Sequence, residues 1–283
     1  MFPSFPFPAK YALERALSFC DNTRRKRKTD SAEKIERHKK MKTVKKGFTL
    51  VELLVVIGIL GILMGVLYPA ISSAMNETSM KTLAMSGRKI VQGIIAADVD
   101  RQSKGKPSVW PHNDENDGKS TDTEDIAGMS FGTSTEYFKE LFDIQNQQDA
   151  DNWAPYIDGC EVGWLAGAGV PTAQPGNLLQ ANVAWTVVSG LTQELGDYIP
   201  ALVSRNADTS TFATSGQNDM STKTTKITLG KQFPQPFGNK GCVIVTKGGG
   251  ADTYKSRDCR LKDIYKSNSF SIPTGITLKY LEP

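Results

Sequence analysis

The sequence predicts an α+β fold in which one long N-terminal helix packs on an antiparallel β-sheet head. Three observations support this prediction. Residues 48–71 are almost all apolar, residues 72–100 alternate apolar and charged positions at helical spacing, and short β-branched segments recur through the rest of the 283-residue chain. An amphipathic helix needs a second layer over its apolar stripe, and successive short strands can supply a sheet.

Charge divides the chain into four segments. Residues 1–47 hold 14 Lys and Arg against 5 Asp and Glu, whereas residues 48–283 hold 20 against 25. We expect residues 1–47 to be a basic leader, 48–71 a membrane-spanning helix, 72–100 its amphipathic continuation and 101–283 an exported globular head. Positive charge beside a span stays in the cytoplasm, so the head should lie on the opposite side of the membrane.

The basic run Arg24–Lys28 has a second interpretation as a nucleic-acid patch, but its place before an apolar span favours a topology signal, and no nucleic-acid partner is expected. Residues 1–40 mix Phe-Pro repeats with a polar run, whereas Met41 opens a short basic leader by itself. We therefore expect translation to start at Met41.

The apolar segment is long enough to cross a membrane and holds one carboxylate. From Leu53 to Asn76 the chain has 24 uncharged residues, about 36 Å as a helix against a hydrocarbon core of about 30 Å. Glu52 lies at the start of this segment, where a buried carboxylate is costly and needs a cation. No Lys or Arg occurs between Glu52 and Lys81, so the chain itself offers no downstream partner.

The sequence around Glu52, basic residues and then Gly47-Phe48-Thr49-Leu50-Val51-Glu52, resembles the start of type IV pilins and type II secretion pseudopilins. The resemblance implies that a prepilin peptidase cuts between Gly47 and Phe48 and methylates the new Phe48 amine. Glu52 then holds the family's acidic fifth position, which is thought to meet the Phe amine of a neighbouring subunit. Pro69 falls at a position where many members also carry proline.

This resemblance implies a bacterial structural subunit, anchored in the inner membrane with a periplasmic or extracytoplasmic head, and then assembled into a type II secretion pseudopilus or a type IV pilus. Its partners would be the prepilin peptidase, other pilin or pseudopilin subunits and the inner-membrane assembly platform. The alternative is a membrane-anchored binding module for glycan, DNA or another surface ligand that does not polymerise. An uncleaved signal anchor or a secretory signal peptide would explain the span but not Glu52.

Glycines within the span share one helix face. Gly58, Gly61 and Gly65 are three and four residues apart, and Gly61-x-x-x-Gly65 is a spacing that lets two helices approach closely in lipid. Ordinary glycine enrichment in membrane helices is the alternative. Pro69 should kink or loosen the helix locally.

Beyond Pro69, helical periodicity predicts that one helix runs from about Phe48 to Asp100. Its second half should bury a stripe against the sheet. The residues of this stripe are Ile71, Met75, Leu83, Ile90, Ile94, Ile95 and Val99.

Residues 104–125 form a polar loop with the spacing of a calcium-binding loop. The candidate ligands are Asn113, Glu115, Asp117 and Glu124. Asn replaces the usual Asp at the first position and Glu replaces it at the third, so a solvated acidic loop is the other interpretation. No other cofactor is expected.

The head should contain one further helix and several strands. Thr133-Ser-Thr-Glu136 is a capping box that opens a helix ending near Gln148. The predicted strands are Val183–Val188, Ile199–Val203, Thr225–Leu229, Val243–Thr246 and Ile276–Leu281. Four aromatic residues form either core or a glycan-stacking surface: Trp153, Tyr156, Trp164 and Trp185.

The exported part has three cysteines, and an oxidising compartment favours pairing. Cys242 and Cys259 lie 17 residues apart across a Gly-rich turn, and they resemble the pair that closes the C-terminal loop of many pilins. Cys160 is then left over. Residues 48–283 contain one histidine, His112, and no phosphate loop, so we expect no enzyme and no zinc site.

Overall fold

The computed structural model describes residues 47–111, 125–149, 151–192, 195–212, 224–265 and 276–283. These include helices α2, α3 and α4 and a five-stranded sheet. The helices are α2 (Leu50–Ser103), α3 (Ser134–Leu141) and α4 (Leu261–Tyr265), and the strands are β1 (Trp185–Ser189), β2 (Pro200–Ser204), β3 (Gly241–Thr246), β4 (Ala251–Lys255) and β5 (Lys279–Leu281). The architecture is α+β and pilin-like, as the sequence predicts.

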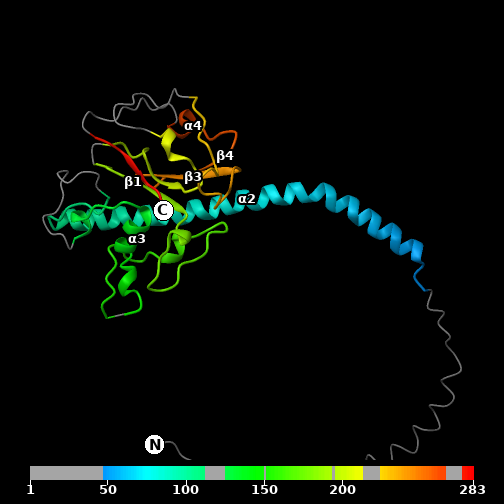
Figure 1. The fold of residues 1–283 in the computed structure, drawn as a ribbon, viewed down its shortest axis with the longest axis horizontal. Coiled ribbons are helices and arrows are strands. Elements are labelled where there is room, and N and C mark those ends of the chain that lie inside the picture. Colours follow the sequence, from blue (N-terminus) through cyan, green and yellow to red (C-terminus); the bar gives the residue numbers. More distant parts are fainter. Residues whose placement is uncertain (1–46, 112–124, 150, 193–194, 213–223, 266–275) are drawn as a thin grey trace, which may run out of the picture. The chain divides into compact units, whose positions relative to one another are not determined.

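The described residues divide into two units, one that ends at Met64 and one that runs from Gly65 to Pro283. Residues 50–64 of α2 belong to the first unit. The rest of α2 lies in the second unit with the sheet and the shorter helices, and Figure 1 shows the strands gathered along the second half of α2.

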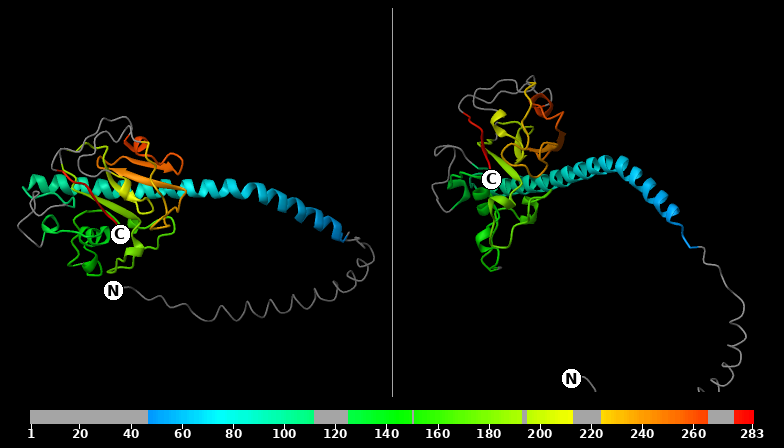
Figure 2. Two further views of the ribbon diagram at one scale, coloured as in Figure 1. Left: turned by 45° about the horizontal axis from the view of Figure 1, so that its top comes forward. Right: turned by 45° about the vertical axis from the view of Figure 1, so that its right-hand side comes forward.

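The sheet is antiparallel throughout, in the order β4-β3-β2-β1-β5. Strands β1 to β4 follow one another as a meander, and β5 returns from the C-terminus to pair with β1, where Val187 lies opposite Leu281. Figure 2 shows the same strands from two further directions. Every residue of β1 and β2 is buried, which means that both faces of the central sheet are covered.

The second half of α2 packs on the sheet. At Gly87 the helix backbone lies very close to side chains of β1 and β3. A Cβ added there would stand 2.5 Å from the Trp185 ring of β1 and 2.8 Å from Val245 of β3. Only a glycine lets the helix backbone come this close. The buried positions on this face are Met80, Leu83, Ala84, Gly87, Ile90, Val91 and Ile94.

The predicted apolar stripe is therefore right in its middle and wrong at its ends. Leu83, Ile90 and Ile94 are buried, but Ile71, Met75 and Val99 are about half or more exposed. Because the buried face of α2 runs only from Met80 to Arg101, apolar residues before it or on the other side of the helix keep their exposure.

One predicted strand is wrong, and one strand was not predicted. Thr225–Leu229 forms no strand and makes only single bridges, from Lys226 to Arg260 and from Leu229 to Ala207. Ala251–Lys255, which was not predicted, pairs fully with β3 as the edge strand β4. Its polar sequence fits a strand with one neighbour and a partly exposed surface.

The second helix begins as predicted and ends early. Thr133 and Glu136 form the expected capping box of α3, with the Glu136 amide donating to Thr133 Oγ1 over 3.2 Å. The helix ends at Leu141 rather than near Gln148, because Asp143 takes a left-handed conformation with φ 47°. A short 3-10 turn, Ile144–Asn146, follows.

Candidate functional site

The peptide bond between Gly47 and Phe48 lies in an accessible, non-helical segment. Helix α2 begins two residues after Phe48, at Leu50, and Gly47 has open space around its Cα. The Phe48 side chain is 74% exposed. A peptidase requires an accessible backbone at the bond it cuts, and Gly47 and Phe48 are both exposed.

Thr49 and Glu52 form a reciprocal cap on the first turn of α2. Glu52 Oε2 accepts hydrogen bonds from the Thr49 backbone N–H over 2.9 Å and from Thr49 Oγ1 over 2.8 Å. In return, Thr49 Oγ1 accepts from the Glu52 backbone N–H over 3.2 Å. This is a capping box, so the Glu52 carboxylate has partners inside its own chain.

Sequence analysis missed the role of Thr49. The signal was available, because Thr49-Leu-Val-Glu52 has the same Thr-x-x-Glu spacing that predicted the cap of α3.

The first half of α2 presents apolar side chains on all sides. Among the described residues, α2 is the one helix long and apolar enough to cross a membrane, and none of its most apolar 18-residue window is buried. A core helix of a soluble protein would be mostly covered. The exposed apolar surface therefore needs lipid or other helices.

Gly58, Gly61, Gly65 and Pro69 all lie within α2. An added Cβ at Gly58, Gly61 or Gly65 would meet nothing within 4 Å, so these residues remain open to a partner helix. Pro69 lies inside α2. The close approach of partner helices at Gly61 and Gly65 stays a prediction.

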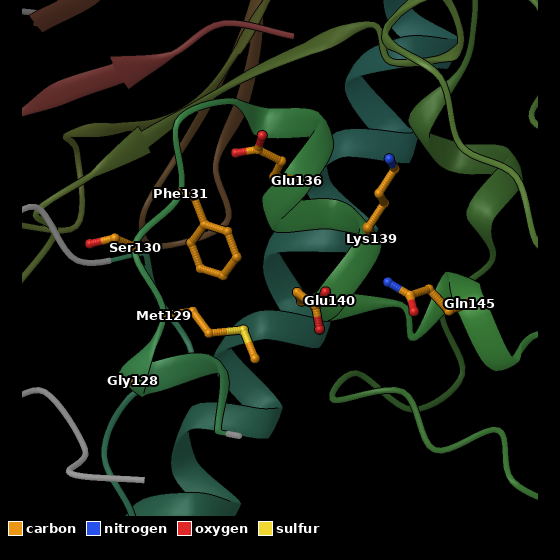
Figure 3. A pocket seen from close by; sticks show the side chains of 8 residues that line it. All are labelled: Gly128, Met129, Ser130, Phe131, Glu136, Lys139, Glu140 and Gln145. Atoms are coloured by element: carbon orange, nitrogen blue, oxygen red, sulfur yellow. The ribbon is translucent and has the colours of Figure 1, made fainter. Parts of the chain in front are cut away.

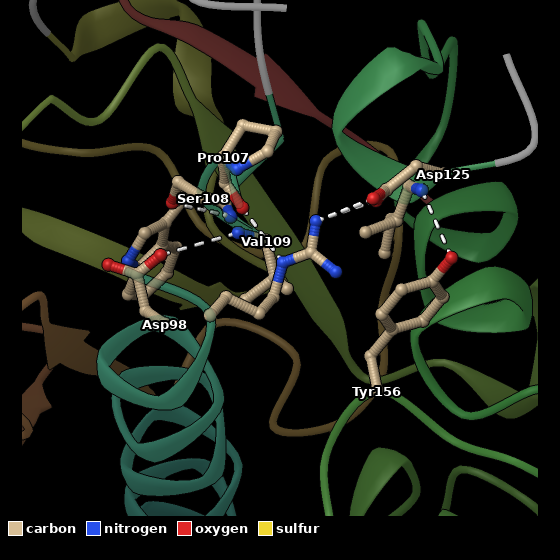
Figure 4. A network of polar contacts seen from close by, with 9 residues as sticks. Asp98, Pro107, Ser108, Val109, Asp125 and Tyr156 are labelled. Atoms are coloured by element: carbon tan, nitrogen blue, oxygen red, sulfur yellow. Dashed lines mark hydrogen bonds and ion pairs between the residues drawn. The ribbon is translucent and has the colours of Figure 1, made fainter. Parts of the chain in front are cut away.

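A buried ion pair joins the end of α2 to the segment that follows it (Figure 4). The Arg101 guanidinium donates to both oxygens of Asp125, over 2.8 and 2.7 Å, and also to the Pro107 carbonyl over 2.8 Å. The Tyr156 ring lies 5.6 Å from the Arg101 guanidinium carbon, and its hydroxyl accepts from the Ile126 N–H. This network fixes the connection into the head and suggests no chemistry of its own.

A hollow of about 430 Å³ lies beside α3 and is lined by residues that include Phe131, Glu136, Lys139 and Glu140 (Figure 3). Glu136 is already engaged in the cap of α3. Within the described part of the chain, no three His, Cys, Asp or Glu side chains gather to hold a metal ion. The predicted calcium ligands Asn113, Glu115, Asp117 and Glu124 lie outside the described residues.

The three described cysteines lie inside the head. Cys242 of β3 and Cys259 are buried thiols, and a hydrogen bond between them together with burial raises the pKa of Cys242. They lie where a disulfide could form, and the disulfide itself stays a prediction. Cys160 packs against Gly93 of α2, and burial raises the pKa of its thiol.

The aromatic residues divide between core and surface. Trp185 is fully buried and its indole N–H donates to the Trp164 carbonyl over 3.2 Å. Trp153 is 38% exposed, with its indole N–H bound to the Phe142 carbonyl. Burial of Trp185 leaves no shared stacking face for the four aromatic residues.

Comparison with known proteins identifies the segment around Gly47 and Phe48. The model of the family described as prokaryotic N-terminal methylation motif matches residues 42–68. This is the prepilin-type cleavage and methylation signal of type IV pilins and pseudopilins. Searches of curated proteins and of solved structures found no match.

Proposed function

We propose that this chain, which carries the prepilin-type signal, is the precursor of a structural subunit of a type II secretion pseudopilus or a type IV pilus. The observation that supports this best is the signal itself, which matches residues 42–68 at the start of an exposed apolar helix. The α+β head packed on the second half of α2 fits the same function.

Processing is the first step of the proposed function. The precursor lies in the bacterial inner membrane with its basic leader in the cytoplasm and its head outside. A prepilin peptidase cuts after Gly47 and methylates the amine of Phe48. The exposed, non-helical backbone at these residues supports cleavage there.

Assembly then uses Glu52. In the single chain its carboxylate accepts two hydrogen bonds from Thr49, which offset part of the cost of placing a charge near lipid. In the filament the same carboxylate pairs with the Phe48 amine of an adjacent subunit. A cation near a buried carboxylate adds a charge-assisted bond that Thr49 cannot supply.

The apolar half of α2 provides the rest of the assembly interface. Its side chains exchange lipid for the helices of other subunits, and Gly61 and Gly65 allow two backbones to approach closely. Subunits are drawn from the membrane by the inner-membrane assembly platform. The role is structural, without catalysis and without a cofactor.

Glu52→Gln tests the assembly step. It keeps side-chain size and one acceptor oxygen for Thr49, but it removes the charge that meets the Phe48 amine. We expect normal insertion and cleavage, with the subunit lost from sheared filaments. Leu53→Gln, at the neighbouring position, is the matched control for a polar group near the start of the span.

Two outcomes decide the proposal. Normal recovery of Glu52→Gln subunits in filaments would contradict the pairing with Phe48. A wild-type subunit that is cleaved but stays in the membrane as a monomer would favour the anchored binding module instead.

A further inference from the structure

A groove of about 520 Å³ lies beside α2 in the second unit, where the apolar half of the helix ends. Its lining includes Tyr68, Ser72, Ser73 and Glu77 of α2 together with Lys240 and Lys255 of the head. Tyr68 is 76% exposed. Aromatic, hydroxyl and ammonium groups thus meet at one place on the head.

The position of Tyr68 along the helix places this groove at a membrane surface. From Thr49 to Tyr68 the helix rises about 29 Å at roughly 1.5 Å per residue, which matches a hydrocarbon core of about 30 Å. Tyrosine is enriched at the boundary between lipid and water. With Thr49 at the cytoplasmic boundary, Tyr68 lies at the extracytoplasmic one.

The charges around the groove favour an anion. Glu77 is held between Lys81 and Lys255, with each ammonium nitrogen 3.2 Å from a carboxylate oxygen, and these contacts lower the pKa of Glu77. Lys240 has no ion-pair partner among the described residues. The charged residues that line the groove are therefore two lysines, Lys240 and Lys255, and one carboxylate, Glu77, which leaves one positive charge uncompensated.

Hydroxyl groups add hydrogen-bond donors to these charges. Ser72 and Ser73 line the groove one turn beyond Tyr68, and Asn76 Nδ2 donates to the Ser72 carbonyl over 2.7 Å. Ammonium and hydroxyl donors together suit a phosphate group.

We propose that this groove binds the phosphate of an anionic phospholipid in the extracytoplasmic leaflet, with Lys240 and Lys255 as its cationic ligands. The proposal rests on the membrane-anchored stage of the proposed function. It does not depend on filament assembly, and it gives the head a contact with the membrane that must break when the subunit is extracted.

Lysine acylation in lipid nanodiscs tests this proposal. The full chain is reconstituted in discs of phosphatidylcholine alone or with phosphatidylglycerol, and a neutral acylating reagent is applied. Mass spectrometry gives the rate at each lysine. We expect Lys240 and Lys255 to be acylated about fivefold more slowly in discs that contain phosphatidylglycerol than in discs of phosphatidylcholine alone. This factor corresponds to the typical free energy that attracts one lysine to an anionic membrane surface. The exposed Lys106 and Lys231 are internal controls and should change little.

A variant then tests whether the two lysines share one ligand. Lys240→Ala should remove most of the protection of Lys255, whereas Lys106→Ala should leave it intact. Protection of Lys255 that survives Lys240→Ala would overturn a shared phosphate site.

Two further outcomes would overturn the assignment. Equal rates in the two kinds of disc would exclude an anionic lipid ligand. Equal protection by inorganic phosphate, added to discs of phosphatidylcholine alone, would identify a site for free phosphate rather than for lipid. Failure of filament assembly in cells would affect neither measurement.

Discussion

Gly87 of α2 faces the Trp185 ring of β1 so closely that an added Cβ would stand 2.5 Å from Cη2 of the indole. Trp185 is fully buried and its N–H is fixed on the Trp164 carbonyl, so the ring cannot move without breaking a hydrogen bond. The helix can therefore pack closely on the sheet at this point, because a glycine lies opposite the large tryptophan side chain.

Gly87→Ala should destabilise the head. The methyl group overpacks a rigid contact, which costs about 1–3 kcal/mol, although alanine favours the helix by about 1 kcal/mol. We expect a net loss, seen as a lower midpoint of thermal unfolding in the near-ultraviolet circular dichroism of the detergent-solubilised chain. Ser86→Ala is the control, and an unchanged midpoint for Gly87→Ala would contradict the packing described here.

The pair Arg101 and Asp125 should contribute strongly to the stability of the head. Their side chains are only 10% and 15% exposed, so Arg101→Met removes the cation that lies against a largely buried carboxylate. We expect a loss of about 3 kcal/mol, the lower end of the range for buried pairs. Chemical denaturation of the full chain measures it.

The double variant Arg101→Met/Asp125→Leu should recover much of that loss, because it leaves no buried charge. Lys104→Met is the surface control, since its ion pair with Asp100 is about 60% exposed on both sides. Equal small effects of Arg101→Met and Lys104→Met would show that the Arg101 pair contributes no more than a surface contact.

These contacts show which features of the head a sequence can reveal. Leu83, Ile90 and Ile94 were predicted to be buried because their spacing repeats along the helix. Gly87 carries no such signal, since its role depends on Trp185 nearly a hundred residues later. Arg101 and Asp125 likewise come together only in the folded chain, and the polar edge strand β4 has a single β-branched residue, Thr253, by which a strand could be recognised.

The N-terminal site was more accessible to sequence analysis, because all its parts lie within six residues. Gly47, Phe48 and Glu52 are recognisable as a local pattern, and a family model matches the segment. Thr49 was missed although its signature is equally local, and only the hydrogen bonds to Glu52 identified it.

Thr49→Ala should loosen the first turn of α2. It removes the hydroxyl that accepts from the Glu52 amide, and losing such a cap costs about 0.5–2 kcal/mol. We expect faster amide hydrogen exchange at residues 50–53 of the chain in nanodiscs. Thr49→Ser keeps the hydroxyl and should exchange like the wild type, so equal acceleration in both variants would argue against the cap.

Cys242 and Cys259 should be joined in the protein recovered from the extracytoplasmic side. Their side chains are in contact and buried, and that compartment favours oxidation. After unfolding without reductant, we expect an alkylating reagent to label Cys160 alone. Labelling of all three cysteines would show that the pair remains reduced, and Cys160→Ser provides the matched control for the assignment.

The most direct test of the proposed function is the mass of the N-terminal peptide of the protein from native cells, compared between membranes and sheared surface filaments. We predict a peptide that begins at N-methylated Phe48 in both fractions. A protein found in the membrane alone, with an N-terminus at Met1 or Met41, would contradict both the processing after Gly47 and the assembly role of Glu52.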